Sequence, residues 1–265
     1  MRLVHVASGR LFGGIEQMLV TMARERRVAP DVSMRFVVAA PERPNRLCEE
    51  LGASGSNVHA LGDVRLSRPA SIVRARTRLR RLLAADPADV VICHAPWSYA
   101  IFAPAARRAG AAVVLWQHDR ADGRSLVERW AARTRADLVI CNSTWTSLSA
   151  GALQPGVPVS VVYPPVTVPA CPSGTPQIVR RDLGADPADV VILSASRLEP
   201  WKGHLNLVRA LGRGRPTEPW RLWIAGAPQR KHEERYLGEL QQEVARLGLD
   251  ARVRFLGERR NVPML

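Results

Sequence analysis

Lysine is almost missing from this chain of 265 residues, although the chain is strongly basic. Only Lys202 and Lys231 are lysines, and arginine supplies the rest of the 38 basic residues, which outnumber 24 acidic ones and give a net charge of +14. A basic surface favours anionic partners such as nucleotides, nucleic acid or anionic lipid. Because heavy arginine usage also reflects a bias in composition, the charge alone does not choose among these partners.

Cysteine is scarce as well. The four cysteines have neither the spacing of metal ligands nor the density of a disulfide framework. They are Cys48, Cys93, Cys141 and Cys171. The pattern predicts a cytoplasmic protein without a metal site.

Long apolar runs and aromatic residues are also few. The longest uncharged stretch, 90–106, contains a histidine and two prolines and is therefore not a membrane span, and the apolar start of the chain is too short for a secretory signal. Aromatic residues make up 5% of the chain, and neither zinc-finger spacing nor an RNA-recognition motif occurs. Nucleic acid is therefore excluded as the expected partner.

Short uncharged strands alternate with amphipathic helices along the chain. Strands are predicted at 3–8, 35–40, 89–93, 112–116, 138–141, 159–162, 190–195, 220–225 and 252–256. Apolar residues at helical spacing predict helices around 15–22, 68–84, 205–211 and 237–247, and Ser125 with Glu128 forms a capping box that starts another. This alternation predicts an α/β fold whose parallel sheets are covered on both faces.

A proline-rich stretch divides the alternation into two parts. Five prolines lie between Tyr163 and Gln177, without any clear period. Such a stretch is typical of a linker between domains. We therefore expect an N-terminal domain over 1–166, a linker over 167–180 and a second domain over 181–265.

The loop after the first strand is rich in glycine. It reads Ser8-Gly9-Arg10-Leu11-Phe12-Gly13-Gly14, and its spacing fits neither a dinucleotide-binding loop nor a P-loop. Glycines let a backbone approach a ligand, and a helix N-terminus offers N–H groups to an anion. The residues leave two interpretations open: phosphate binding, or a tight turn.

The loop that precedes the helix at 205–211 concentrates cations. Arg197 and Lys202 flank a turn that contains Pro200, and Gly203 starts the helix. Two cations beside a helix N-terminus, at the carboxyl end of a parallel strand, suit a diphosphate. The alternative is a solvated loop with unrelated charges.

Five segments together carry a family resemblance. They are Gly13-Gly14-Ile15-Glu16, His118-Asp119, Ser196-Arg197-Leu198-Glu199-Pro200-Trp201-Lys202-Gly203, Gly226 and Val253-Arg254-Phe255-Leu256-Gly257. With these segments nearly the whole chain resembles the family-4 retaining glycosyltransferases (glycosyl transferase group 1) of GT-B fold. The resemblance implies two Rossmann-like domains that face a cleft, the first for the acceptor and the second for a nucleotide-diphosphate sugar.

The resemblance also implies roles for single residues. Arg197 and Lys202 would neutralise the donor diphosphate as it leaves, and His118 would lie beside the sugar or the acceptor hydroxyl, with no metal or other cofactor. The donor-binding residues would be Gly13, Gly14, Glu16, Gly203 and Gly226. Without the resemblance, His118 also fits a structural role at a strand end, and Glu16 fits the ordinary preference for an acidic residue in the first turn of a helix.

The chain departs from the family in one respect. The family carries two glutamates seven residues apart in its second domain, and the eight residues after Gly257 do not supply them. We therefore expect an incomplete second domain, in a fragment that is weakly active or inactive alone. A non-catalytic remnant that binds nucleotide diphosphates, and a sugar-nucleotide epimerase of similar fold, remain as alternatives.

The predicted helix Arg68–Ala84 is basic and amphipathic. Arg74, Arg78 and Arg81 lie on one side of it, opposite an apolar stripe. Such a helix suits docking on an anionic membrane surface, here the inner face of the cell membrane, and a lipid-linked acceptor would suit such docking, with a glycan acceptor equally open. The alternative is an ordinary surface helix of an arginine-rich protein.

Overall fold

A computed structural model describes residues 1–41, 43–167, 175–214 and 217–265, which form two compact units. Unit 1 spans Met1–Thr167, and unit 2 comprises the described residues that follow. Half of the predicted linker, 168–174, lies outside the described residues, and its last six residues, 175–180, belong to helix α8 (Thr175–Asp182). Every helix in the described ranges falls short of the length and apolarity needed to span a bilayer.

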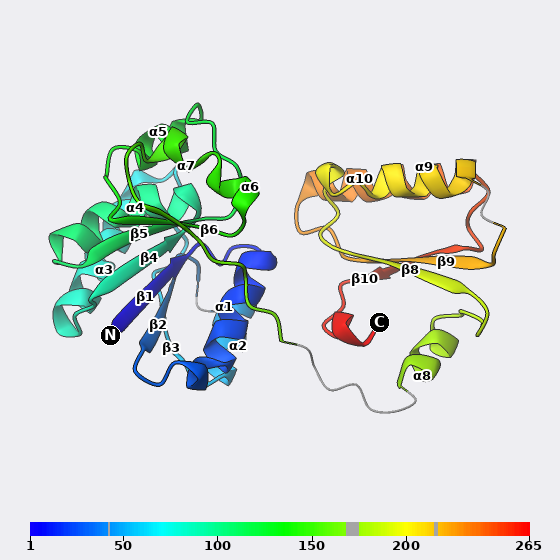
Figure 1. Cartoon of the computed structure of the whole chain (residues 1–265), viewed down its shortest axis with the longest axis horizontal. Helices are drawn as coiled ribbons and strands as arrows, with labels where there is room; N and C mark the ends of the chain where they lie inside the picture. The colour runs from blue at the N-terminus through cyan, green and yellow to red at the C-terminus, as the bar shows by residue number, and fades with distance from the viewer. Residues whose placement is uncertain (42, 168–174, 215–216) are drawn as a thin grey trace. The chain divides into compact units, whose positions relative to one another are not determined.

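Unit 1 is built on a seven-stranded, entirely parallel sheet in the order β3-β2-β1-β4-β5-β6-β7 (Figure 1). The strands are β1 (Arg2–Ala7), β2 (Ser33–Val38), β3 (Asn57–Ala60), β4 (Val90–His94), β5 (Ala112–Gln117), β6 (Leu138–Cys141) and β7 (Val159–Val161). Most residues of the inner strands β1, β2, β4 and β5 are apolar and buried, as expected of a parallel sheet covered on both faces, whereas the edge strands β3 and β7 have no buried residue. The α/β alternation predicted from the sequence is confirmed here, and β3 is an addition to it.

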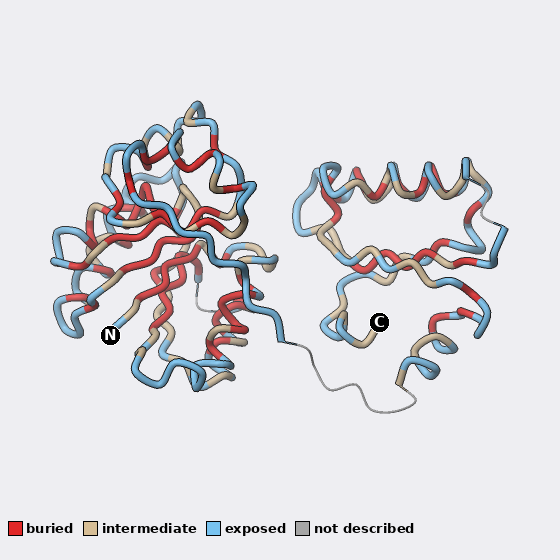
Figure 2. The backbone as a smooth tube through the Cα atoms, in the orientation of Figure 1, coloured by how far each residue is buried: buried red, intermediate tan, exposed pale blue. Residues whose placement is uncertain are grey.

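Helices cover both faces of this sheet. They are α1 (Gly14–Arg24), α2 (Arg46–Ala53), α3 (Pro69–Ala85), α4 (Ala95–Arg108), α5 (Leu126–Ala131), α6 (Thr144–Ser147) and α7 (Ala150–Leu153). One buried cluster joins α1 and α2 to one face, and a larger cluster joins α3, α4, α5 and α7 to the other. Figure 2 shows the buried backbone concentrated along the strands and the inner sides of these helices. The predicted capping box of α5 is confirmed: the Ser125 hydroxyl accepts the Glu128 N–H, and the Glu128 carboxylate accepts the Ser125 N–H, both at 3.2 Å.

Helix α4 forms in the stretch whose prolines interrupt the sequence pattern. Pro96 lies in the first turn, where its missing N–H costs nothing. Pro104 lies inside the helix, where it cannot donate to the carbonyl of Ala100. Arg76 of α3 replaces that donor, because its guanidinium donates to the carbonyls of Ala100 at 3.2 Å and Ile101 at 2.6 Å. A long-range side-chain contact thus satisfies what the local sequence leaves unsatisfied.

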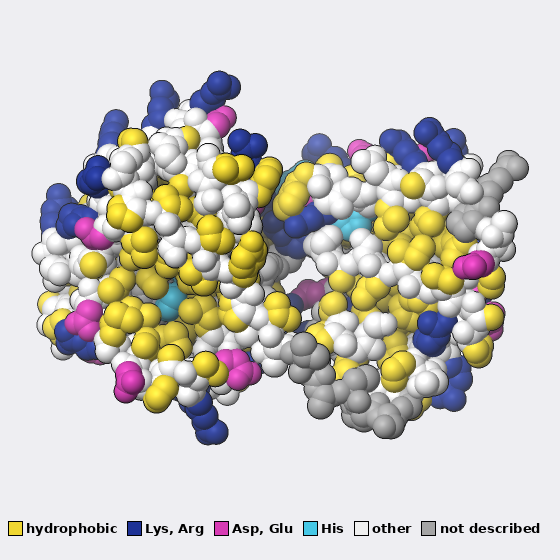
Figure 3. Space-filling view, viewed as in Figure 1, with side chains coloured by type: hydrophobic (Ala, Val, Ile, Leu, Met, Phe, Trp, Pro, Cys, Tyr) yellow, Lys and Arg dark blue, Asp and Glu magenta, His cyan; other side chains and the backbone are white. Residues whose placement is uncertain are grey.

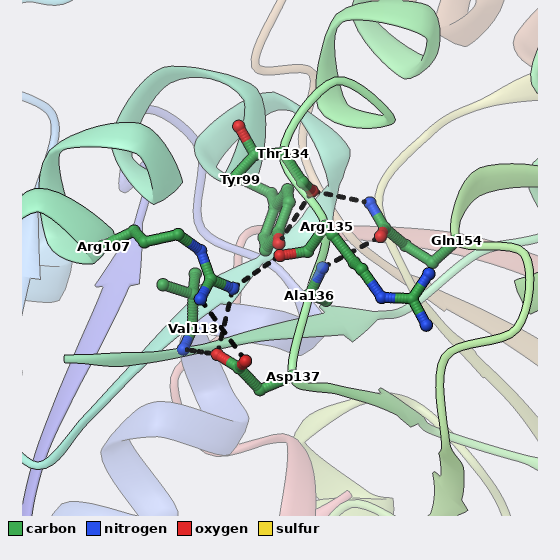
Figure 4. Close-up of polar contacts among 8 residues, drawn as sticks. All are labelled: Tyr99, Arg107, Val113, Thr134, Arg135, Ala136, Asp137 and Gln154. Carbon is green, nitrogen blue, oxygen red and sulfur yellow. Dashed lines mark hydrogen bonds and ion pairs between the residues drawn. The ribbon is translucent and has the colours of Figure 1, made fainter. Parts of the chain in front are cut away.

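A polar network closes the end of unit 1 where β5 and β6 begin (Figure 4). Asp137 accepts the Val113 N–H at 2.7 Å and pairs with Arg107 at 3.0 Å, while Arg107 also donates to the carbonyl of Arg135. Gln154 of the loop after α7 accepts the Ala136 N–H at 3.0 Å. The polar groups at the amino-terminal edge of the sheet are therefore engaged with one another and serve to hold β5 and β6 in place.

Arginines are spread over unit 1 rather than gathered. Figure 3 shows the basic side chains around the rim of the visible face of this unit. Arg74 and Arg81 of α3 are exposed, whereas Arg78 donates to the carbonyl of Leu61 at 3.0 Å and thereby ties α3 to the end of β3.

Unit 2 contains a three-stranded parallel sheet in the order β10-β9-β8. Its elements are α8, β8 (Val190–Ala195), the 3₁₀ turn η2 (Pro200–Lys202), α9 (His204–Gly214), β9 (Trp220–Ala225), α10 (Lys231–Arg246), β10 (Val253–Gly257) and the 3₁₀ turn η3 (Val262–Met264). Helices α9 and α10 pack on one face around Leu222, Ile224 and Leu240, and α8 lies on the other face with Trp223. The strands and helices predicted for this part of the chain are confirmed.

Gly226, directly after β9, lets the backbone there approach the backbone of Ser196, directly after β8, very closely. The Ser196 N–H donates to the carbonyl of Ala225 at 3.0 Å, and the Gly226 N–H donates to the carbonyl of Gly257 at 2.8 Å. A Cβ atom at position 226 would collide with the Ser196 carbonyl oxygen. The loop that carries Arg197 can therefore adopt this backbone path only when residue 226 is a glycine.

We expect Gly226→Ala to destabilise unit 2 by about 1–3 kcal/mol, because the collision is with backbone that cannot rotate away. Gly238→Ala is the matched control, since its new Cβ meets open space within α10 and should stabilise the helix by about 1 kcal/mol. Urea unfolding followed through the indole NMR signal of Trp223 measures both changes. Equal stability of the two variants would contradict the close contact between residue 226 and the Ser196 carbonyl.

Candidate active site

The carboxyl edge of the unit 1 sheet contains a topological switch point. Strands β1 and β4 are neighbours, but the helix after β1 packs on one face and the helix after β4 on the other. In open parallel sheets, ligands bind in the crevice that this change of direction creates. The glycine loop follows β1, and His118 follows β5, which is the next strand beyond β4.

The glycine loop is held by contacts of its own. Gly9 has a φ of +61°, and a Cβ there would collide with Val38. Glu16 is buried, and its carboxylate accepts the Gly13 N–H at 3.0 Å, which caps the N-terminus of α1. A Cβ at Gly14 would meet open space. The structure thus gives Glu16 a capping role and engages the amide of Gly13, while Gly14 opens the helix with free space beside it.

His118 is the end of a row of three imidazoles. The Nδ1 atom of His5 lies 3.0 Å from Nε2 of His94, and Nδ1 of His94 lies 3.1 Å from Nε2 of His118. His5 and His94 are buried, and His118 is partly exposed. The centroids of neighbouring histidine rings are 5.3 Å apart at each step, Phe36 contacts His5, and Trp116 contacts both His94 and His118.

Sheet register explains why the rings meet. His5 pairs with Ile92 across β1 and β4, and His94 lies two residues further along β4 on the same face. His94 in turn pairs with Trp116 across β4 and β5, and His118 again lies two residues further on. The three rings therefore form a staircase across neighbouring strands.

Burial keeps the row uncharged. It lowers the pKa of His5 to about 4 and the pKa of His118 to about 4. For His94, burial and the proximity of His5 and His118 hold the pKa well below the usual value for histidine. At neutral pH all three side chains are neutral imidazoles.

The turn that carries His118 is fixed from neighbouring strands. The side-chain amide of Asn142 donates to the His118 carbonyl at 2.8 Å. The amide of the fully buried Gln117 donates to the Asp119 carbonyl and to the Ser149 hydroxyl, both at 3.0 Å. The position of His118 is therefore set by the residues around it as well as by its strand.

Unit 2 holds Arg197 between two buried carboxylates at the carboxyl end of its sheet. The guanidinium donates to Glu199 at 2.8 Å and lies 3.8 Å from Glu233, which is completely buried at the start of α10. Glu233 also accepts the Gln229 N–H at 2.6 Å. Glu199 and Glu233 thus fix the direction of the arginine, which a single flexible ion pair would not do.

Lys202 and Gly203 shape the same loop. Lys202 ends η2, and its ammonium lies 3.8 Å from the ring centroid of Trp201, which is 66% exposed. Gly203 has a φ of +80°, which favours glycine, and leads into α9. The buried His204 begins α9 and lies 3.0 Å from the Ser196 hydroxyl. The loop therefore carries a lysine and a helix N-terminus a few residues after the arginine. The two cations have different neighbours: Arg197 contacts Glu199 and Glu233, and Lys202 contacts the ring of Trp201.

One group of side chains has the composition of a metal site. The ligand atoms of Glu199, His232 and Glu233 all lie within 4.8 Å of one another. The Arg197 guanidinium lies 2.8 Å from Glu199 and 3.8 Å from Glu233, so a metal ion at this place would compete with it for both carboxylates.

The candidate residues from the sequence thus fall into two groups. Those of unit 1 lie at the carboxyl edge of its sheet: Gly13, Gly14, Glu16 and His118. Those of unit 2 lie at the carboxyl edge of the other sheet: Arg197, Lys202, Gly203 and Gly226.

Sequence reasoning missed His5, His94 and Glu233. For the two histidines a signal existed, namely one histidine within each of two strands that are otherwise apolar. Glu233 resembles any acidic residue in the first turn of a helix, so its sequence position gives no such signal.

Family comparisons cover almost all of the chain. The family described as Glycosyltransferase Family 4 matches residues 12–169, and the family described as Glycosyl transferases group 1 matches residues 177–265. A comparison with curated proteins gives no match.

Solved structures share the fold at low sequence identity. Anabaena Alr3699/HepE in complex with UDP and glucose superposes with a TM-score of 0.80 at 22% identity, over 100% of this chain and 71% of that chain. A glycosyltransferase from Rickettsia africae gives 0.77 at 14% identity over 99% and 69%, and sucrose-phosphate synthase from Thermosynechococcus elongatus gives 0.74 at 12% over 98% and 71%. The predicted α/β fold of GT-B type is confirmed by these similarities.

The neutral histidines predict acid sensitivity of unit 1. The unfolded imidazoles have pKa values near 6.5 and the folded His5 and His118 near 4, so between these values the unfolded chain binds more protons. The free energy of unfolding should therefore fall as the pH drops from about 6.5 to 4, by on the order of 3 kcal/mol for each of these histidines. Urea unfolding of unit 1, followed through the methyl NMR signals of Met18 and Met34, measures this slope.

The control variants are His5→Phe and His232→Ala. His5→Phe should reduce the slope of the unfolding free energy against pH by an amount that corresponds to about one bound proton. His232→Ala, at an exposed position in unit 2, should leave this slope unchanged. A slope of zero over this range in the unmodified chain would contradict neutral buried imidazoles.

Proposed function

The chain belongs to glycosyltransferase family 4, and from this premise we propose that it transfers a sugar from a nucleotide-diphosphate donor to a glycan or lipid-linked acceptor, with retention of configuration and without a metal. The observation that carries the proposal is the site of unit 2, where Arg197, Lys202 and the start of α9 follow one strand of a parallel sheet. The UDP and UDP-glucose complexes of the Anabaena protein support a nucleotide-sugar donor.

The proposed chemistry in unit 2 is electrostatic. When the bond between the sugar C1 and the donor phosphate oxygen breaks, negative charge develops on the leaving diphosphate. Arg197, oriented by Glu199 and Glu233, and Lys202 stabilise that charge, as does the N-terminus of α9. Since Arg197, Lys202 and the N-terminus of α9 supply this stabilisation, the proposed reaction needs no metal ion.

Unit 1 supplies the acceptor side in this proposal. Gly14 opens α1 with free space beside it, so the backbone there can approach the donor phosphates. His118, held by Asn142 and by the histidine row, lies beside the transferred sugar or the acceptor hydroxyl. The acceptor proton passes to an oxygen of the leaving diphosphate, so no carboxylate of this chain acts as nucleophile.

A lipid-linked acceptor would bring the chain to an anionic membrane surface. The exposed Arg74 and Arg81 of α3 support this part of the proposal by their charge, whereas Arg78 is engaged with the Leu61 carbonyl. The proposed site of action is the inner face of the cell membrane.

We expect Arg197→Ala and Lys202→Ala each to weaken binding of UDP by about 1.5–3 kcal/mol, because each removes a charge-assisted hydrogen bond to the diphosphate. That loss corresponds to a rise in Kd of about ten- to 150-fold, measurable by isothermal titration calorimetry. Arg213→Ala is the matched control, since Arg213 is exposed in the last turn of α9, away from the carboxyl edge. Unchanged Kd values in both site variants would remove the diphosphate assignment.

Product analysis tests the reaction itself. The purified chain is incubated in EDTA with a panel of nucleotide sugars and with glycan or lipid-linked acceptors. Because its second domain is expected to be incomplete, turnover should be slow, and the glycoside that forms should have the anomeric configuration of the donor, as read from anomeric proton signals by NMR. An inverted product would contradict retention, and restoration by magnesium alone would contradict metal independence. Epimerised donor, or tight nucleotide binding without transfer to any acceptor, would instead indicate one of the two alternative functions.

A further inference from the structure

The histidine row permits only two arrangements of its hydrogens. Each neutral imidazole carries a single N–H, and each of the two ring-to-ring hydrogen bonds needs one hydrogen. If Nδ1 of His94 carries the hydrogen, then His5 and His118 carry theirs on Nδ1 as well. If Nε2 of His94 carries it, all three rings are Nε2–H. The tautomers of the three rings are therefore coupled.

The inner end of the row distinguishes the two arrangements. Nε2 of His5 is buried and has no hydrogen-bond partner among the described residues. The Nε2–H arrangement would leave a buried N–H group there without an acceptor, whereas the Nδ1–H arrangement leaves only an unused lone pair. Buried N–H groups without partners are rarer in proteins than acceptors with spare capacity. The structure thus favours Nδ1–H throughout the row.

The backbone directly after His94 has a strained conformation. Ala95 has a φ of +68°, the single positive value for a residue other than glycine in the described part of the chain. The left-handed conformation costs an alanine about 1–2 kcal/mol and is retained where the surroundings demand it. The Ser98 hydroxyl donates to the carbonyls of His94 and Ala95, which locks the first turn of α4 behind the ring. The backbone that carries His94 is therefore held by contacts independent of those that its ring makes.

We propose that His5 and His94 are positioning residues that hold His118 as its Nδ1–H tautomer, so that the outer nitrogen of His118 donates a hydrogen bond to an oxygen of the bound substrate. His118 then recognises an acceptor of hydrogen bonds, such as a sugar hydroxyl or a phosphate oxygen, and does not serve as a general base. The tautomer is a property of unit 1 alone, whereas its use on a sugar substrate rests on the proposed function.

The unmodified chain provides the first test. With ¹⁵N-labelled histidine rings, two-bond ¹H–¹⁵N correlation spectra distinguish protonated from unprotonated ring nitrogens, and only six histidines contribute. A His118→Ala variant assigns the relevant signals. We expect Nδ1 of His118 to be protonated and Nε2 to be bare at pH 7. A His118 with its proton on Nε2 would overturn the proposal.

Two substitutions at position 94 test whether the row imposes this tautomer. His94→Asn places a side-chain amide near the position of the ring Nδ1, so its N–H can still donate to Nε2 of His118 and should preserve the Nδ1–H form. His94→Phe keeps an aromatic ring in the stack but removes the donor, so His118 should lose its fixed tautomer and gain a proton on Nε2. Unchanged His118 signals in His94→Phe would refute a positioning role, and His232→Ala should leave these signals as they are in the unmodified chain.

Catalysis gives a separate readout. In His94→Phe we expect kcat to fall at least tenfold with a smaller change in the KM for the donor, and His94→Asn to recover most of the loss. If the ¹⁵N spectra are as expected but kcat falls equally in His94→Phe and His94→Asn, the tautomer of His118 is established but its hydrogen bond to the substrate is refuted. Absence of sugar transfer in the unmodified chain would contradict the proposed function without affecting the NMR result.

Discussion

The parallel pairing of β1, β4 and β5 is the constraint on which the site of unit 1 depends. Neighbouring strands lie about 4.8 Å apart, and residues two positions apart share a face. The ring centroids of His5, His94 and His118 follow each other at 5.3 Å, close to this strand spacing. A shift of the β4 register by one residue would turn His94 to the other face and break the row. The geometry of His118 is therefore a property of the whole sheet.

The two units handle charge in opposite ways. In unit 1, burial removes charge from three basic side chains, and their hydrogen bonds to one another compensate for the loss of water. In unit 2, the Arg197 guanidinium instead pairs with Glu199 and Glu233, two buried carboxylates. A neutral row fixes the direction of a hydrogen bond, while a guanidinium held by two carboxylates presents its remaining N–H donors in a fixed direction. The proposed function uses the first for the sugar or acceptor and the second for the diphosphate.

Much of the fold could be predicted from the sequence, because strand and helix periods are local properties of the chain. The apolar strands, the helix with Leu240 and Val244 and the capping box at Ser125 are all where the pattern placed them. Helix α4 was not predicted, since its prolines argue against a helix when read locally. Arg76 stabilises the interrupted helix from another element, and nothing in the sequence near α4 indicates that contact.

The site divides along the same line. The sequence by itself determined the glycine loop, the Arg197 to Gly203 turn and the position of His118 at a strand end, because each is a short motif next to a predicted strand. Only the tertiary structure decided that Glu233 flanks Arg197 and that His5 and His94 lead to His118. These partners are separated by up to 89 residues along the chain and meet only when the strands and helices that carry them are packed together, which no local pattern contains.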